Sequence, residues 1–175
     1  MYRVIGIDPG SRKTGYGIIE VASSGILYVA SGNISVADQA FTERLGVIYS
    51  EVLELITTYQ VCEMAIEEVF VAKNPSSALK LGQARGVAIA AGVAKNLEIF
   101  EYAARQVKKS IVGKGGATKF QVQHMVTLLL NLPGIPQADA ADGLALALCH
   151  AHTSSNIIKW LTTTTFIKQF MIVNI

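Results

Sequence analysis

The chain has 175 residues, of which 51% are hydrophobic and 16% charged, and its formal net charge is +2. The length predicts one domain with a single core, and the composition excludes a disordered acidic or basic protein. Two cysteines exclude a disulfide framework and favour a reducing, cytoplasmic setting, and no apolar run reaches the ~18 residues that span a bilayer.

The first 36 residues predict three strands. Apolar runs cover residues 3–8, 14–21 and 26–36, with Pro9-Gly10 as a turn after the first run and glycines near the other boundaries. Together the three strands predict an antiparallel meander.

The rest of the chain alternates between predicted helices and strands. Residues 38–59 have helical spacing of apolar side chains that includes Tyr49, with Asp38 as the expected N-cap, and a second helix covers residues 76–95. Further strands are predicted at residues 64–70 and 99–102, and further helices at 103–112, 118–130 and 137–152. This order predicts an α/β domain with a mixed five-stranded sheet flanked by helices. A C-terminal tail at residues 153–175 follows, with a frayed end or a strand packed on the core favoured over a contact for a partner.

The net charge conceals a separation of charge along the chain. Taken alone, a charge of +2 argues against a nucleic-acid-binding protein. Residues 1–68 are acidic overall, whereas residues 69–138 hold nine basic side chains and two acidic ones. This basic segment is a candidate for binding polyanions, and a solvated lysine surface is the alternative.

Carboxylates stand in apolar surroundings at three places. Asp8 ends the first strand, Glu67 and Glu68 lie inside the apolar run 64–70, and Asp139 and Asp142 lie one helical turn apart among alanines. Strand alternation allows only one of Glu67 and Glu68 to join a given site, and does not choose between them. Taken singly, these residues are also explained as a turn residue, an exposed side chain or a helix N-cap.

As a set, the carboxylates favour a metal site. Converging carboxylates repel one another, by about 4 kcal/mol per pair at 4 Å and an effective dielectric constant of 20. Divalent cations remove that repulsion, and carboxylate ligands suit hard ions such as Mg²⁺ or Mn²⁺. Two such ions can activate a water and stabilise the leaving oxygen in phosphodiester cleavage.

Six segments, in this order, closely resemble the RuvC family of bacterial Holliday-junction resolvases. They are residues 5–11 (IGIDPGS), 65–70 (AIEEVF), 77–86 (SALKLGQARG), 101–108 (EYAARQVK), 121–126 (QVQHMV) and 137–142 (QADAAD). The resemblance implies an RNase H-like nuclease domain over residues 1–152. It implies a homodimer that nicks four-way junction DNA symmetrically, on strands of like polarity, leaving 5′-phosphate and 3′-hydroxyl ends. It also implies a role in recombination and repair alongside the RuvA and RuvB branch-migration proteins.

The resemblance further implies roles for single residues. The family's four acidic ligands fall on Asp8, Glu67, Asp139 and Asp142, which would hold two Mg²⁺ ions, with Mn²⁺ as a substitute, and would leave Glu68 as a neighbour. Two lysines match cations near the family's site, where they would neutralise phosphate: Lys108 and Lys119. A stacking contact with an unpaired base is implied for Phe70. Backbone contacts to DNA are expected for further basic residues, namely Lys80, Arg85, Lys109 and Lys114.

Two other functions compete with this interpretation. Residues 7–11 (IDPGS) resemble the first phosphate loop of actin-like ATPases and sugar kinases, but those proteins need two such domains and the length predicts one. A junction-binding module without catalysis predicts the loss of at least one metal carboxylate, yet all four are present. The tail departs from the family, since residues 162–175 are Thr-rich and then apolar, whereas members often end in a polar, basic segment.

Histidine and cysteine positions predict no further site. His124, His150 and His152 have no metal-ligand spacing with a cysteine, so we expect structural roles for them. Cys62 and Cys149 are expected to be buried thiols.

Overall fold

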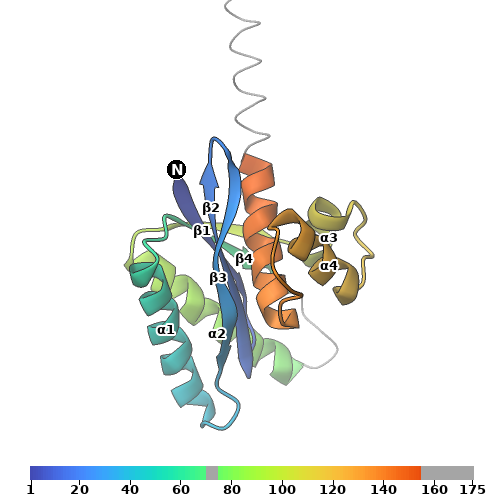
Figure 1. The fold of residues 1–175 in the computed structure, drawn as a ribbon. Helices are drawn as coiled ribbons and strands as arrows, with labels where there is room; N and C mark the ends of the chain where they lie inside the picture. Colours follow the sequence, from blue (N-terminus) through green and yellow to red (C-terminus); the bar gives the residue numbers. More distant parts are fainter. Residues whose placement is uncertain (70–74, 155–175) are drawn as a thin grey trace, which may run out of the picture.

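A five-stranded sheet forms the middle layer of the computed structural model, which describes residues 1–69 and 75–154 (Figure 1). The strands β1 (Tyr2–Asp8), β2 (Lys13–Ala22), β3 (Gly25–Ser35), β4 (Glu63–Glu67) and β5 (Glu98–Tyr102) lie in the order β3-β2-β1-β4-β5. The first three strands are antiparallel, while β4 pairs in parallel with both β1 and β5. The predicted mixed sheet and its N-terminal meander are therefore confirmed.

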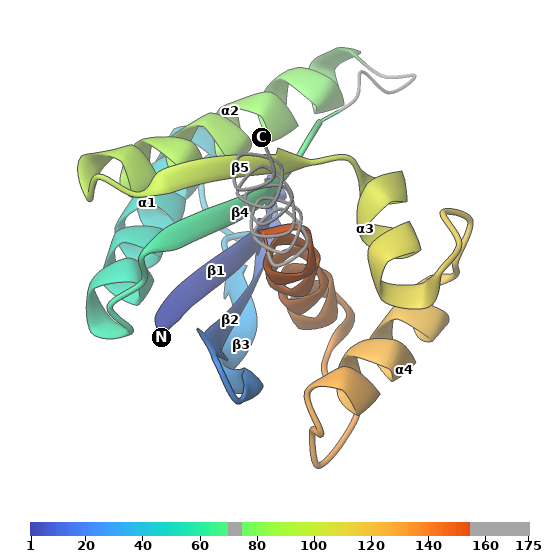
Figure 2. The same ribbon diagram turned by 90° about the horizontal axis from the view of Figure 1, so that it is seen from above.

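Helices cover both faces of this sheet (Figure 2). The helices α1 (Phe41–Thr58) and α2 (Pro75–Ala94) pack on one face, against a buried cluster that includes Ile5, Ile7, Met64 and Ile66. On the other face lie α3 (Ala104–Val112), α4 (Lys119–Leu129) and the helical residues 138–154, named the C-terminal helix. The central strands read as continuous apolar runs because both of their faces are buried. None of the helices in the described residues is long and apolar enough to cross a membrane.

Several sequence predictions need correction. The helix α1 begins at Phe41, because its N-cap is Ala40, whose backbone N–H donates to the Glu43 carboxylate at 3.1 Å; the prediction of Asp38 as N-cap was wrong. Tyr49 was expected on the apolar face of α1, but it is 37% exposed. Strand β4 ends at Glu67, three residues earlier than predicted. Cys149 is buried as expected, whereas Cys62 is exposed.

Candidate active site

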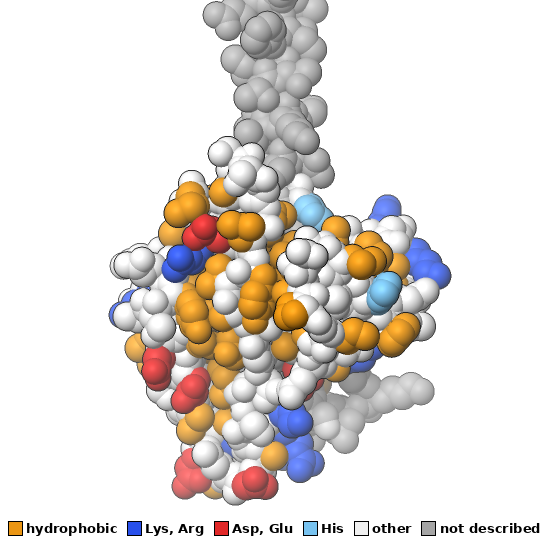
Figure 3. All heavy atoms as spheres, in the orientation of Figure 1, with side chains coloured by type: hydrophobic (Ala, Val, Ile, Leu, Met, Phe, Trp, Pro, Cys, Tyr) orange, Lys and Arg blue, Asp and Glu red, His pale blue; other side chains and the backbone are white. Residues whose placement is uncertain are grey.

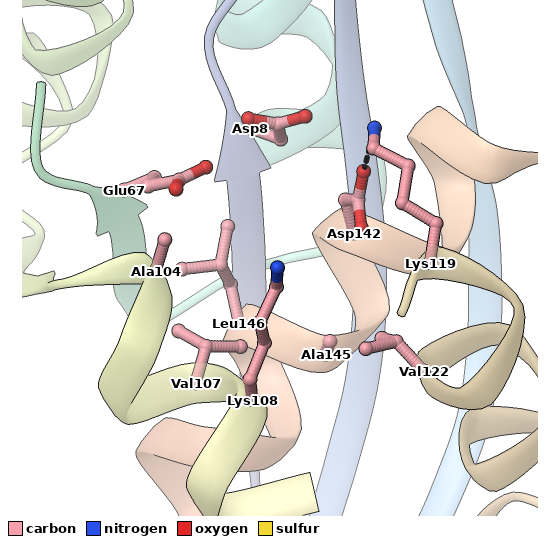
Figure 4. Close-up of a pocket in the computed structure, with 10 residues that line it drawn as sticks. All are labelled: Asp8, Glu67, Ala104, Val107, Lys108, Lys119, Val122, Asp142, Ala145 and Leu146. Atoms are coloured by element: carbon pink, nitrogen blue, oxygen red, sulfur yellow. Dashed lines mark hydrogen bonds and ion pairs between the residues drawn. The ribbon is translucent and has the colours of Figure 1, made fainter. Parts of the chain in front are cut away.

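Asp8 and Glu67 end two neighbouring parallel strands, β1 and β4. The register pairs Ile7 with Ile66, so the two carboxylates follow at the same level on the same edge of the sheet. Both side chains point to the face that carries the C-terminal helix (Figure 4). After Asp8 the chain turns at Gly10, and Thr14 holds this turn by donating to the Gly10 carbonyl at 3.1 Å and accepting from its N–H at 3.3 Å. The first two members of the predicted acidic set are therefore adjacent.

Glycines in the sheet let the C-terminal helix approach at backbone contact. A Cβ added at Gly6 would lie 2.0 Å from the carbonyl oxygen of Gly143, and one at Gly15 would lie 2.1 Å from that of Asp139. Gly15 is the β2 partner of Asp8, so the start of the helix rests beside the end of β1. This contact brings Asp142, which precedes Gly143, to the edge where Asp8 stands.

One cavity of about 230 Å³ collects these groups (Figure 4). Its charged lining consists of Asp8, Glu67, Asp142, Lys108 and Lys119, contributed by β1, β4, the C-terminal helix, α3 and α4. The apolar floor comes from α3, α4 and the C-terminal helix, and includes Ala104, Val107, Val122, Ala145 and Leu146. Five elements that are distant in the sequence thus place three carboxylates and two amines around one small space.

The carboxyl group of Asp8 is strongly perturbed by its surroundings. Burial, together with a hydrogen bond to Glu67 and the negative charges of Glu67 and Asp142, raises the pKa of Asp8 to about 8. The Lys119 ammonium opposes this shift. Lys119 donates to Asp142 at 3.0 Å, and that bond and the attraction to Asp142 raise the pKa of the lysine, with smaller contributions from Asp8 and Asp139. The positive charge of Lys119 therefore offsets the burial and repulsion that act on Asp8 only in part.

Arg85 on α2 holds the end of β4 in place. Its Nε donates to the carbonyl oxygen of Glu67 at 2.9 Å, and its Nη2 bonds the carboxylate of Glu101 on β5. The guanidinium thus joins α2 to the two strand ends beside the cavity. Sequence reasoning assigned no role to Glu101, although it is one of only two acids in the basic segment 69–138, which was the available signal.

The other predicted site residues are placed as follows. Asp139 is half-buried and does not line the cavity, although its charge acts on Lys119. Three predicted DNA-contacting lysines are exposed: Lys80 on α2, which lies 5.6 Å over the Phe41 ring, Lys109 on α3, and Lys114 in the loop before α4. Figure 3 shows basic side chains at the α3 edge and acidic ones over α1. Phe70 lies outside the described residues, as does the tail from residue 155.

The chain is similar in sequence and structure to known resolvases. The family model "Crossover junction endodeoxyribonuclease RuvC" matches residues 4–150. A protein of that name from Pseudoalteromonas atlantica is 57% identical over 156 residues, which are 89% of this chain and 90% of the relative. The structure of Thermus thermophilus RuvC in complex with Holliday junction substrate is similar with a TM-score of 0.82 at 30% identity, over 88% of this chain and 95% of that one.

A more distant structure shares the fold alone. The yeast mitochondrial Holliday junction resolvase Ydc2 is similar with a TM-score of 0.67 at 11% identity, over 97% of this chain and 86% of that one. Together with the Thermus structure, this likeness confirms the predicted RNase H-like fold.

Proposed function

The chain belongs to the RuvC family of crossover junction endodeoxyribonucleases, and we propose that it resolves four-way Holliday junctions by metal-dependent nicking. The observation that carries the proposal is the cavity at which Asp8, Glu67 and Asp142 meet Lys108 and Lys119. Carboxylates gathered from three separate elements are the expected ligands of hard divalent cations in a phosphodiester-cleaving site.

The donor set fits such cations. The pKa of Asp8 is raised by burial and by the negative charges of Glu67 and Asp142, and a divalent cation bound beside the carboxylates would offset both effects. Within residues 1–69 and 75–154, no three His, Cys, Asp or Glu side chains already lie in an arrangement that could hold a metal ion. Because they share one cavity, we propose that Asp8, Glu67 and Asp142 move together to bind the ions, with Asp139 as the fourth ligand one helical turn before Asp142. When bound, two Mg²⁺ ions, or Mn²⁺ in their place, would activate a water and stabilise the leaving 3′-oxygen of the scissile phosphate.

The protein's own side chains have three tasks in this reaction. The carboxylates would hold the ions only when they are deprotonated. Asp8 must therefore lose the proton that its raised pKa favours at neutral pH. Lys119 holds Asp142 at 3.0 Å and, with Lys108, presents positive charge to the phosphate. Exposed Lys109 and Lys114 extend this positive charge outside the cavity, where they suit contacts to the DNA backbone.

The remaining parts of the proposal follow from the family resemblance. The chain would act as a homodimer whose two sites nick strands of like polarity symmetrically and leave 5′-phosphate and 3′-hydroxyl ends. We place this reaction in recombination and repair, in cooperation with RuvA and RuvB. The proposal also retains Phe70, Lys80 and Arg85 as DNA contacts.

The test is nicking of a synthetic four-way junction in Mg²⁺ or Mn²⁺. We expect the wild-type chain to introduce paired nicks, and expect four amide variants to bind the junction without cutting it: Asp8→Asn, Glu67→Gln, Asp139→Asn and Asp142→Asn. Glu68→Gln is the matched control: Glu68 is exposed and lies with Asp8 and Glu67 in an adjoining pocket, but it does not line the cavity that Asp142, Lys108 and Lys119 share, so this variant should cut normally. Wild-type protein that binds junctions but never nicks them would refute the proposal.

A further inference from the structure

A buried histidine joins the C-terminal helix to the sheet, away from the cavity. His150 is 1% exposed. Its Nδ1 lies 2.7 Å from the hydroxyl oxygen of Tyr102, and its Nε2 lies 2.8 Å from a carboxylate oxygen of Glu63. The Phe100 ring packs against the imidazole with 4.3 Å between centroids. Two strands, β4 and β5, therefore hold one side chain of the helix.

Hydrogen bonds join the polar groups of this cluster. A carboxylate can only accept, so Nε2 donates to Glu63, and the Ser154 hydroxyl oxygen lies 3.3 Å from the same nitrogen. The other ring nitrogen, Nδ1, is paired with the Tyr102 hydroxyl. Burial raises the pKa of Tyr102 to about 12, which keeps that hydroxyl protonated. A buried polar network of this kind fixes one relative placement of its members, because any shift leaves a buried group unpaired.

The cluster lies one strand length away from the acids. Glu63 and Glu67 are the first and last residues of β4 and point to the same face, about 13 Å apart along the strand. His150 lies eight positions after Asp142 on the C-terminal helix, a rise of about 12 Å, with Leu146 between them at the cavity floor. The two lengths match. The helix thus runs antiparallel to β4, with Glu63–His150 at one end and Glu67 and Asp142 at the other.

We propose that His150 is a positioning residue for the metal site: by bonding Glu63 and Tyr102, it fixes the rotation and register of the C-terminal helix so that Asp142 faces Asp8 and Glu67. A slip of one residue would move Asp142 by 1.5 Å and rotate it by about 100°, out of the cavity. The inference rests on the proposed function, because it concerns the metal ligands of that reaction.

The experiment compares His150→Ala with Leu148→Ala in the full-length chain. Leu148 is a core residue of the same helix with 1% exposure, so its truncation destabilises the fold without removing the polar anchor. We expect His150→Ala to weaken Mn²⁺ binding about tenfold, measured on the DNA-free protein by the loss of the free-ion paramagnetic resonance signal. The Mg²⁺ concentration for half-maximal nicking should rise by a similar factor, while the rate at saturating Mg²⁺ stays within about threefold of wild type.

Two milder variants keep the test decisive if His150→Ala does not fold. Tyr102→Phe removes one hydroxyl, and His150→Gln retains an amide donor toward Glu63 but no longer places a ring nitrogen at the Nδ1 position opposite the Tyr102 hydroxyl. Both should give intermediate shifts in metal affinity. The inference would be overturned if every His150 and Tyr102 variant that folds binds Mn²⁺ with wild-type affinity. It would also be overturned if Leu148→Ala loses as much Mn²⁺ affinity as His150→Ala. Wild-type protein that binds Mn²⁺ but does not nick junctions would refute the proposed function, while the Mn²⁺ comparison still decides the role of His150.

Discussion

Replacing Gly6 by alanine should damage both the stability and the activity of this protein. The added Cβ would lie 2.0 Å from the Gly143 carbonyl oxygen and 2.6 Å from the Ala147 backbone nitrogen, and neither backbone atom can swing aside as a side chain would. Reaching even the 3.0 Å limit of observed contacts requires the helix to move about 1 Å from the sheet. Overpacking of this kind lowers the free energy of unfolding by about 1–3 kcal/mol. We expect a value near the top of that range, because the contacted atoms belong to the backbone.

The same displacement should disable the site, because Asp142 precedes Gly143 on the helix that must move. A misplacement of about 1 Å can cost about 100-fold in rate. Urea unfolding followed by circular dichroism gives the stability change, and single-turnover nicking of a four-way junction gives the rate. Gly46→Ala is the matched control, since Gly46 is exposed in α1 with nothing within 4 Å of an added Cβ. The free energy of unfolding of that variant should rise by about 0.5–1 kcal/mol, and it should cut junctions normally. A Gly6→Ala protein with wild-type unfolding and nicking would refute this reasoning.

Two further predictions concern pH and salt. The pKa of Asp8 is raised to about 8 by burial and by its carboxylate neighbours, so bound metal must displace a proton, and Mn²⁺ affinity should fall about tenfold per pH unit below 8. Over the same range, from about pH 4 to 8, Asp8 binds more proton in the folded metal-free chain than in the unfolded chain, whereas His152, whose pKa is lowered by burial, binds less. As the pH rises, the melting temperature of the wild type in EDTA should therefore decline relative to that of Asp8→Asn, in which the Asp8 contribution is absent; parallel curves for the two proteins would contradict the assignment. Lys109→Gln and Lys114→Gln should each lower the slope of log junction affinity against log salt by about 0.9, measured by fluorescence anisotropy, whereas Lys95→Gln, at the opposite end of β5, should leave it unchanged.

Local sequence signals predicted most of the fold because they act within a few residues. Apolar runs with β-branched residues, ended by glycine or proline, located the first three strands to within two residues. The boundaries that failed depend on side-chain detail. Asp38 has the right chemistry for an N-cap, but Glu43 reaches back to Ala40 and starts α1 later. Strand β4 stops at Glu67, although the apolar pattern continues to residue 70.

The site was predictable only where it depends on strand order. Asp8 ends a run that reads as a buried strand, and parallel neighbours bring strand ends together. Glu67 lies inside the predicted run 64–70, and it reaches the same edge because β4 ends there. The position of Asp142 depends on how closely the C-terminal helix approaches the sheet, and that distance is set by Gly6 and Gly15, to which the sequence alone gave no packing role. Among the histidines, His150 has a buried structural role, whereas His124 is exposed beside Phe120.

The raised pKa of Asp8 means that the acids are gathered at an electrostatic cost before any cation arrives. Interactions outside the acidic set must therefore hold the carboxylates together. Arg85 holds the end of β4 through the Glu67 carbonyl, and Gly6 admits the helix at backbone contact. At the far end of the same helix, His150 provides the polar anchor. None of these three residues supplies a carboxylate, so a search for metal ligands alone would overlook them. Substitution of any of these three residues should first weaken metal binding, because the carboxylates remain present but are no longer held at the right separation.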